Sequence, residues 1–185
     1  MAASAGGLAA VTHLLAGLPP DFAAIIVFVQ HLDPKHRSLM HEIMGRRSNL
    51  PVTQAVDGMD LEPGHVYLAP PDNHMLVNSD ATVSLTRSEL VNFVRPSADL
   101  LFESVAAAYG ERAIAVVLTG AGNDGSMGVT AIKSRGGTVI AQDESSSEFF
   151  GMPSAAIRTG AVDFVLSLEE IPAALRLLVA GELPD

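Results

Sequence analysis

The stretch AIAVVLTGAGNDGSMGVTAIKSRGGTVIAQ, residues 113–142, contains the pattern that decides the fold. AIAVVLT (113–119) is a continuous apolar run rich in β-branched residues, which is typical of a strand buried on both faces. A glycine-rich loop follows, then a segment with helical spacing that closes on two glycines, then a second strand-like run, GTVIAQ (137–142). A strand, a helix and a strand in this order indicate two parallel strands joined by a crossover helix.

The same alternation of apolar runs and helical segments extends along the rest of the chain. MLVNSDATVSLT (75–86) is the exception, because its two short runs flank a polar turn, which is typical of a β-hairpin. We therefore predict a doubly wound α/β fold, with a mostly parallel sheet, helices on both faces and a β-hairpin addition. The expected strands are 24–29, 51–56, 65–70, 113–119, 137–142 and 163–168, and the expected helices are 7–17, 36–47, 97–108, 124–137, 153–159 and 168–181.

The start of the chain departs from this pattern. A parallel-sheet domain normally opens on a strand, yet only three residues precede Ser4, and the first helical segment follows at once. We expect the opening strand to be absent or shortened, and a single domain over residues 1–185.

Composition narrows the possible functions. Of the 185 residues, 48% are hydrophobic and 17% are charged, which suits one domain with a sizeable core. The formal net charge of -10 disfavours binding to nucleic acid or to an anionic membrane surface. The absence of cysteine excludes disulfides, thiolate metal sites and cysteine nucleophiles. No run reaches the roughly 18–20 apolar residues that cross a bilayer, so we expect a cytoplasmic protein without membrane insertion.

Three polar side chains fall where the chain leaves the predicted sheet. Ser4 precedes the first helix, His31 follows the strand expected at 24–29, and Asp124 follows the strand expected at 113–119. The carboxyl ends of parallel strands meet at one edge, where ligands bind in open α/β sheets. A serine nucleophile, a histidine base and an orienting carboxylate are the parts of an acyl-transfer site. Taken one at a time, Ser4 and Asp124 are each more simply explained as helix caps.

The loop TGAGNDG (119–125) supports a second interpretation. Its glycines spell G-x-G-x-x-G, the dinucleotide-binding fingerprint, and Asp143 follows at a suitable distance. Two features count against an NAD(P)-binding protein: the motif comes late in the chain, and Asp124 would bring a carboxylate close to a pyrophosphate. A third interpretation is a binding module of the same fold that has lost catalysis. The histidines lack the spacing of a helical metal site, so we expect neither a metal nor an organic cofactor.

Six blocks of sequence occur in an order that matches one known family. Together they resemble the catalytic domain of the chemotaxis protein-glutamate methylesterases (CheB-type), and the likeness covers essentially the whole chain. The blocks are SAGG (4–7), QHLDPKH (30–36), VYLAPPDNH (66–74), FVRPSAD (93–99), VLTGAGNDG (117–125) and FGMPSAAI (150–157).

The resemblance implies a serine hydrolase that removes methyl esters from γ-glutamyl groups on the cytoplasmic helices of chemoreceptors, with deamidation of receptor glutamines as a second activity. By motif position, its nucleophile falls on Ser4, its base on His31 and its acid on Asp124. The backbone N–H groups of Ala121 and of Ala5, next to the nucleophile, would hold the developing oxyanion. No metal or organic cofactor is implied.

The chain departs from the family pattern at its start, in one loop and in its domain content. Met1 and Ala2 stand where the family has a longer strand and a glycine, and alanine replaces the usual methionine in the oxyanion loop. We expect no receiver domain here, and a regulatory domain, separate or fused, as a further partner. Arg95, Arg158 and Lys35 are the candidates for positive charge near the pocket.

Overall fold

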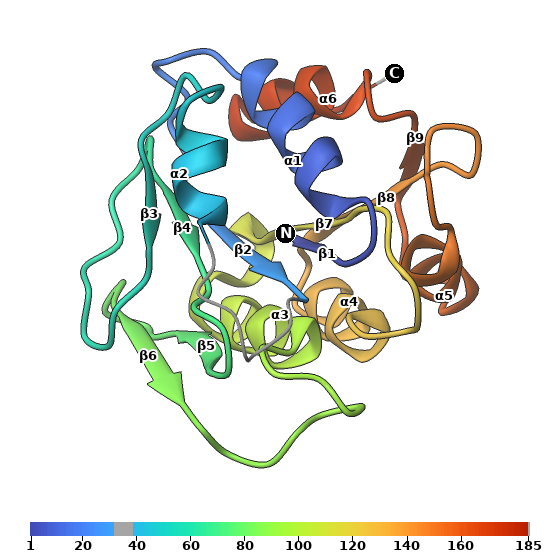
Figure 1. The fold of residues 1–185 in the computed structure, drawn as a ribbon. Coiled ribbons are helices and arrows are strands. Elements are labelled where there is room, and N and C mark those ends of the chain that lie inside the picture. The colour runs from blue at the N-terminus through green and yellow to red at the C-terminus, as the bar shows by residue number, and fades with distance from the viewer. Residues whose placement is uncertain (32–38, 185) are drawn as a thin grey trace.

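The structure, a computed structural model, describes residues 1–31 and 39–184. The strands are β1 (Ala2–Ala3), β2 (Ile26–Gln30), β3 (Val52–Gln54), β4 (Val66–Leu68), β5 (His74–Val77), β6 (Val83–Thr86), β7 (Ile114–Val117), β8 (Thr138–Gln142) and β9 (Phe164–Leu166). The helices are α1 (Gly7–Ala16), α2 (Met40–Gly45), α3 (Ala98–Tyr109), the 3-10 turn η1 (Gly110–Arg112), α4 (Ser126–Ser134), α5 (Gly151–Arg158) and α6 (Ile171–Val179). In this part of the chain, seven parallel strands form one sheet in the order β3-β4-β2-β1-β7-β8-β9, beside the antiparallel hairpin β5-β6 (Figure 1). The predicted doubly wound α/β fold with a hairpin addition is confirmed.

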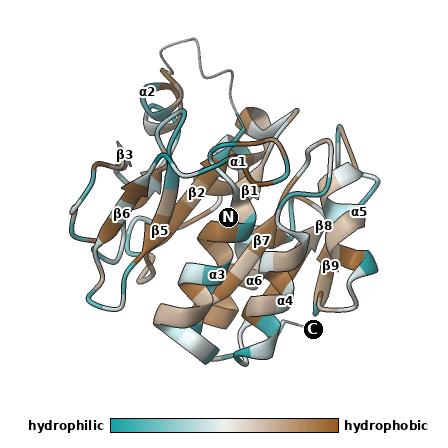
Figure 2. Cartoon of the chain, turned by 90° about the horizontal axis from the view of Figure 1, so that it is seen from below, coloured by the Kyte–Doolittle hydropathy of each residue, from teal (hydrophilic) through white to brown (hydrophobic). Residues whose placement is uncertain are grey.

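Helices cover both faces of the sheet. Figure 1 shows α1, α2 and α6 on one face and α3, α4 and α5 on the other. Strand β7 shows how one run of sequence supplies both layers, because alternate side chains of a strand point to opposite faces. Val117 belongs to the core beneath α3, α4 and α5, whereas Val116 and Leu118 belong to the core beneath α1, α2 and α6. The apolar strands in Figure 2 are therefore covered on both sides.

Several helices are shorter than the sequence pattern predicts. The helix expected at 36–47 spans Met40–Gly45, and residues 36–38 lie outside the described residues. The helix expected from residue 124 begins at Ser126, because Gly125 has a φ of 96°, a left-handed conformation that favours glycine. Among the described helices, none is long and apolar enough to cross a membrane.

The first strand, β1, has only two residues but lies in the middle of the sheet. It pairs with β2 on one side and with β7 on the other. The chain builds β2 to β4 on one side of β1 and β7 to β9 on the other, so the strand order reverses there. Ligands bind beyond the carboxyl ends of the strands at such a reversal. Ser4, His31 and the loop 119–125 leave β1, β2 and β7 at this edge.

Candidate active site

Ser4 lies at the carboxyl end of β1 and is held by bonds from several segments. Its N–H donates to the Thr119 carbonyl (3.1 Å), and its carbonyl accepts from the Gly7 N–H (2.9 Å) and from the Gln30 side-chain amide (2.6 Å). These bonds fix the backbone that carries the hydroxyl, although β1 is short. Within the described residues the hydroxyl makes no hydrogen bond, and the N-cap of α1 is Gly6 without a side-chain cap. Ser4 is therefore not the cap of the first helix.

The ring of His31 and the carboxylate of Asp124 are in hydrogen-bond contact. Nε2 of His31 lies 2.7 Å from Oδ2 of Asp124, and the two side chains are only 13% and 4% exposed. Because little water reaches the pair, its electrostatic interaction is screened less than it would be at the surface. A carboxylate acceptor fixes the neutral ring with its proton on Nε2, which leaves the lone pair of Nδ1 free to accept a proton.

Asp124 is held by the first turn of α3. Its carboxylate accepts hydrogen bonds from the Ser97 hydroxyl (2.9 Å), the Ala98 N–H (2.6 Å) and the Asp99 N–H (3.2 Å). N–H groups at a helix start have no partner within the helix, and they favour a negative charge. Burial alone would raise the pKa of Asp124, but hydrogen bonds from His31 and from the start of α3, with the charge of His31, outweigh burial and lower it. The acid is therefore ionised at neutral pH.

A carboxylate on α3 also binds the first turn of α4. Asp99 accepts hydrogen bonds from the Gly128 N–H in the first turn of α4 (2.8 Å) and from the Asn92 side-chain amide (3.1 Å). Burial raises the pKa of Asp99 above its ordinary value, and the charge of Asp124 adds to the effect. Asp99, which lies in α3, thus caps α4, and Asp124, which lies just before α4, caps α3. The explanation of Asp124 as the cap of its own helix is wrong, because the N-cap there is Gly125 with no side-chain cap.

This exchange of carboxylates disfavours the dinucleotide interpretation of 119–125. A pyrophosphate would need free N–H groups at the start of α4, and the Asp99 carboxylate already occupies that end. Gly125 and Gly128 instead allow Phe102 to pack closely against this turn. Within residues 1–31 and 39–184, no group of three or more histidine or acidic side chains is placed to hold a metal ion.

The loop after β7 packs against Ser4 on one side and α5 on the other. Gly120 accepts a hydrogen bond from the Met152 N–H of α5 (2.8 Å). A Cβ at Gly120 would lie 2.9 Å from the Cβ of Ser4, so this approach requires glycine. In the described part of the chain, the N–H groups of Ala5 and Ala121 donate no hydrogen bond. Free donors therefore lie on both loops that border Ser4.

Sequence patterns assigned no part in the site to Gln30, His74 or Ser97. The side-chain amide of Gln30 donates to the carbonyls of Ser4 (2.6 Å) and His31 (3.2 Å), which links the backbone of both residues. The fully buried His74 accepts the Ser97 N–H at Nδ1 (3.1 Å) and so helps to place the Ser97 hydroxyl. All three stand inside the blocks that carry the family resemblance, which is the signal that marks them.

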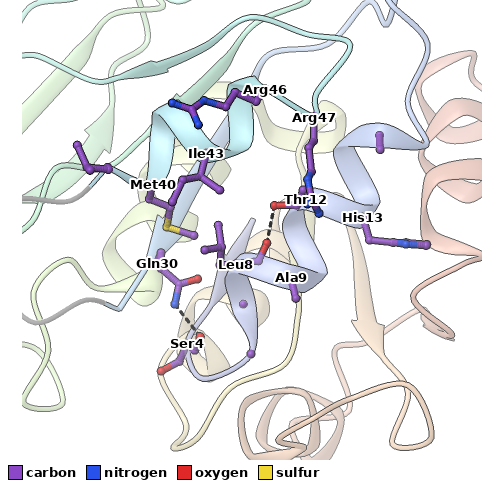
Figure 3. A pocket seen from close by; sticks show the side chains of 14 residues that line it. Ser4, Leu8, Ala9, Thr12, His13, Gln30, Met40, Ile43, Arg46 and Arg47 are labelled. Carbon is purple, nitrogen blue, oxygen red and sulfur yellow. Dashed lines mark hydrogen bonds between the residues drawn. The ribbon is translucent and has the colours of Figure 1, made fainter.

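A cleft of about 1090 Å³ runs from Ser4 between α1 and α2. Figure 3 shows Ser4 at one end of the cleft, with Leu8 and Ile43 along it, and Arg46 and Arg47 at the other end. The cleft therefore joins the predicted nucleophile to two cations at the end of α2.

Two of the three side chains expected to bring positive charge near the pocket, Arg95 and Arg158, do not line this cleft. Arg95 forms an ion pair with Asp72 (2.6 Å), and Arg158 donates to the Ser154 hydroxyl (2.7 Å). Neither arginine is among the described residues that line the cleft, and Lys35 lies outside the described residues. Arg46 and Arg47 were not among the candidates, because helical spacing over 36–47 does not show which neighbours the end of that helix meets.

The family model for CheB methylesterase matches residues 1–175. This chain belongs to the CheB methylesterase family. A putative protein-glutamate methylesterase/protein-glutamine glutaminase from Leptospira interrogans is 40% identical over 168 residues, covering 91% of this chain and 87% of the relative. Protein-glutamate methylesterase/protein-glutamine glutaminase 4 from Myxococcus xanthus is 41% identical over 181 residues, and this CheB-family chain spans about half of that protein (51%). The crystal structure of the Thermotoga maritima CheB methylesterase catalytic domain superposes with a TM-score of 0.92 at 38% identity, covering 96% of this chain and 95% of that one.

Proposed function

We propose that this chain is the catalytic domain of a protein-glutamate methylesterase, acting on γ-glutamyl methyl esters of chemoreceptor cytoplasmic helices and deamidating receptor glutamines. The observation that carries the proposal is the buried contact between His31 and Asp124, at the edge of the sheet where Ser4 leaves β1. The names of the relatives supply the substrate class, since they are methylesterases and glutaminases.

The catalytic cycle follows from the roles of three side chains. The Ser4 hydroxyl attacks the ester carbonyl and passes its proton to Nδ1 of His31. The imidazolium returns that proton to the methoxide oxygen, so that methanol leaves and an acyl-enzyme remains. His31 then takes a proton from water, which attacks the acyl-enzyme, and returns that proton to Oγ of Ser4 as the ester bond to the enzyme breaks and the glutamate carboxylate leaves. Throughout, the Asp124 carboxylate orients the ring and stabilises its charged form.

The N–H groups of Ala121 and Ala5 hold the oxyanion in this proposal. Both are free of internal partners in the described chain, and their loops border Ser4. A backbone donor does not depend on its side chain, so alanine at position 121 serves as methionine does in the family. Losing one such donor costs about 10²–10³ in rate in other enzymes.

Replacement of the nucleophile tests the proposal directly. We expect Ser4→Ala to lower methanol release from a γ-glutamyl methyl ester peptide by about 10³-fold or more, because the acyl-enzyme cannot form. Ammonia release from the matching glutamine peptide should fall in parallel. The control is Ser134→Ala, which changes an exposed serine at the end of α4.

Two outcomes would contradict the proposal. Equal methanol release by wild type and Ser4→Ala would remove Ser4 as the nucleophile. A folded wild-type protein that releases no methanol from any such peptide would favour the binding module instead.

A further inference from the structure

The cleft that begins at Ser4 has a charge opposite to that of the whole chain. The sequence carries 21 acidic against 11 basic residues, a formal net charge of -10. Yet no carboxylate lies among the described residues that line the cleft, and its far end is lined by Arg46 and Arg47. An acidic protein with a basic cleft end has a local preference for anions that its overall charge does not predict.

Neither arginine is neutralised within the described chain. Both are exposed, and neither forms an ion pair, although Glu42 lies one turn before Arg46 on α2. Figure 3 shows the Arg47 side chain extending beside α1, next to Thr12 and His13. Both guanidinium groups are therefore available to a ligand in the cleft.

The dimensions of the cleft match an extended ligand and not an ester group alone. At about 1090 Å³ it slightly exceeds the 300–1,000 Å³ of typical small-molecule sites. The lining of the cleft runs along α1 from Gly7 to Ala16, a rise of about 13.5 Å, so the cleft is long enough to hold two turns of a bound helix. Between these ends the wall carries the half-exposed side chains of Leu8 and Ile43, which suit an apolar helix face.

We propose that Arg46 and Arg47 form a subsite for a carboxylate that the substrate helix carries about two turns from the methyl ester. This inference rests on the proposed function, since it takes the ester to lie at Ser4. The two cations offset the repulsion between an acidic enzyme and an acidic helix and fix the register in which the helix lies. A methyl ester in a helix without that carboxylate is accordingly a poorer substrate.

The test uses two helical peptides that each carry one γ-glutamyl methyl ester. They differ in having glutamate or alanine two turns from the ester, since a glutamine there would itself be a substrate for deamidation. The variant is Arg46→Glu/Arg47→Glu, and the matched control is Arg135→Glu/Arg176→Glu, which changes the net charge equally at two exposed arginines outside the cleft lining. The measured quantity is the ratio of kcat/KM for the glutamate peptide to that for the alanine peptide, which cancels any general effect on catalysis.

Wild type and the control variant should prefer the glutamate peptide about fivefold to tenfold at low salt, because partly exposed ion pairs are individually weak. The preference should shrink as salt is added, and the cleft variant should lose or reverse it. The same preference in the cleft variant as in wild type would overturn the subsite and leave the methylesterase function standing. Peptide binding is also measured with Ser4→Ala proteins that have Arg46 and Arg47 either intact or changed to glutamate. If binding shows the arginine-dependent preference but the wild type turns over neither peptide, the subsite is supported and the proposed function is refuted.

Discussion

At the scale of single residues, the site depends on side chains that bind backbone as much as on those that meet a substrate. Gln30 is 5% exposed, and its amide nitrogen donates to the carbonyls of Ser4 and His31. Because Gln30 links the backbone after β1 to the backbone after the neighbouring strand β2, a shift at Gln30 would change the distance between the proposed nucleophile and the proposed base. A glutamine after a strand gives no sign of this role, because the sequence does not show that its side chain turns back to the neighbouring strand.

Gln30→Glu removes the donor while keeping the size of the side chain. Its carboxylate would face two carbonyl oxygens in a buried position, so we expect the free energy of unfolding to fall by about 2–3 kcal/mol. We expect kcat to fall at least about tenfold in the folded fraction, since small misplacements of catalytic groups are costly. Urea unfolding and methanol release measure the two effects. Gln54→Glu, at the end of β3 and outside the site, is the control, and wild-type behaviour of Gln30→Glu would remove the linking role.

At the scale of elements, α3 and α4 are coupled through their first turns. Asp124 precedes α4 but caps α3, and Asp99 lies in α3 but caps α4. Sequence patterns place both helices well, because apolar spacing and terminal glycines are local signals. They assign Asp124 to the wrong helix, because a local pattern can pair a carboxylate only with the N–H groups that follow it in sequence. Asp124, the proposed catalytic acid, is therefore positioned by the start of a helix that lies 25 to 27 residues earlier in the chain.

The two acids of this pair should affect stability in opposite directions with pH. The pKa of Asp124 is lowered, so its contribution is present above the unfolded value of 3.8 and is lost as the pH falls through the folded pKa. The pKa of Asp99 is raised, so its contribution is present below 3.8 and is lost as the pH rises through the folded pKa. Ionised Asp99 is thus a cost at neutral pH.

Asp99→Asn should remove that cost, because the amide oxygen still accepts the Gly128 N–H while staying neutral. We expect the variant to gain stability relative to wild type as the pH rises from about 4 to 7. Asp99→Ala also lacks the charge but leaves the buried N–H without a partner, so it should be about 1–3 kcal/mol less stable than Asp99→Asn at every pH. Urea unfolding across this range compares the three proteins. A difference between Asp99→Asn and wild type that does not change with pH would show that the charge of Asp99 is not responsible.

At the scale of the whole molecule, the sheet consists of two halves that meet at β1. Long apolar runs such as 113–119 predicted the strands on either side, since strands buried on both faces leave a clear signal. Two alanines leave none, so the sequence indicated only that the opening strand was short or missing. What it could not show is that these residues fill the central position. Their register is set by β2 and β7, which are distant in sequence.

Ala3→Pro should therefore affect the whole fold. Proline removes a backbone donor from the central strand, and only β1 joins β2 to β7 in the described sheet, so we expect a loss of about 3 kcal/mol or more in the free energy of unfolding. Ser4 follows directly, so methanol release should disappear at temperatures where the wild type is active. Ala23→Pro is the control, since Ala23 is exposed before β2 and its N–H donates no hydrogen bond in the described structure. If Ala3→Pro unfolded at the same urea concentration as Ala23→Pro, the two halves of the sheet would be held together by the helical layers, and β1 would serve only to position Ser4.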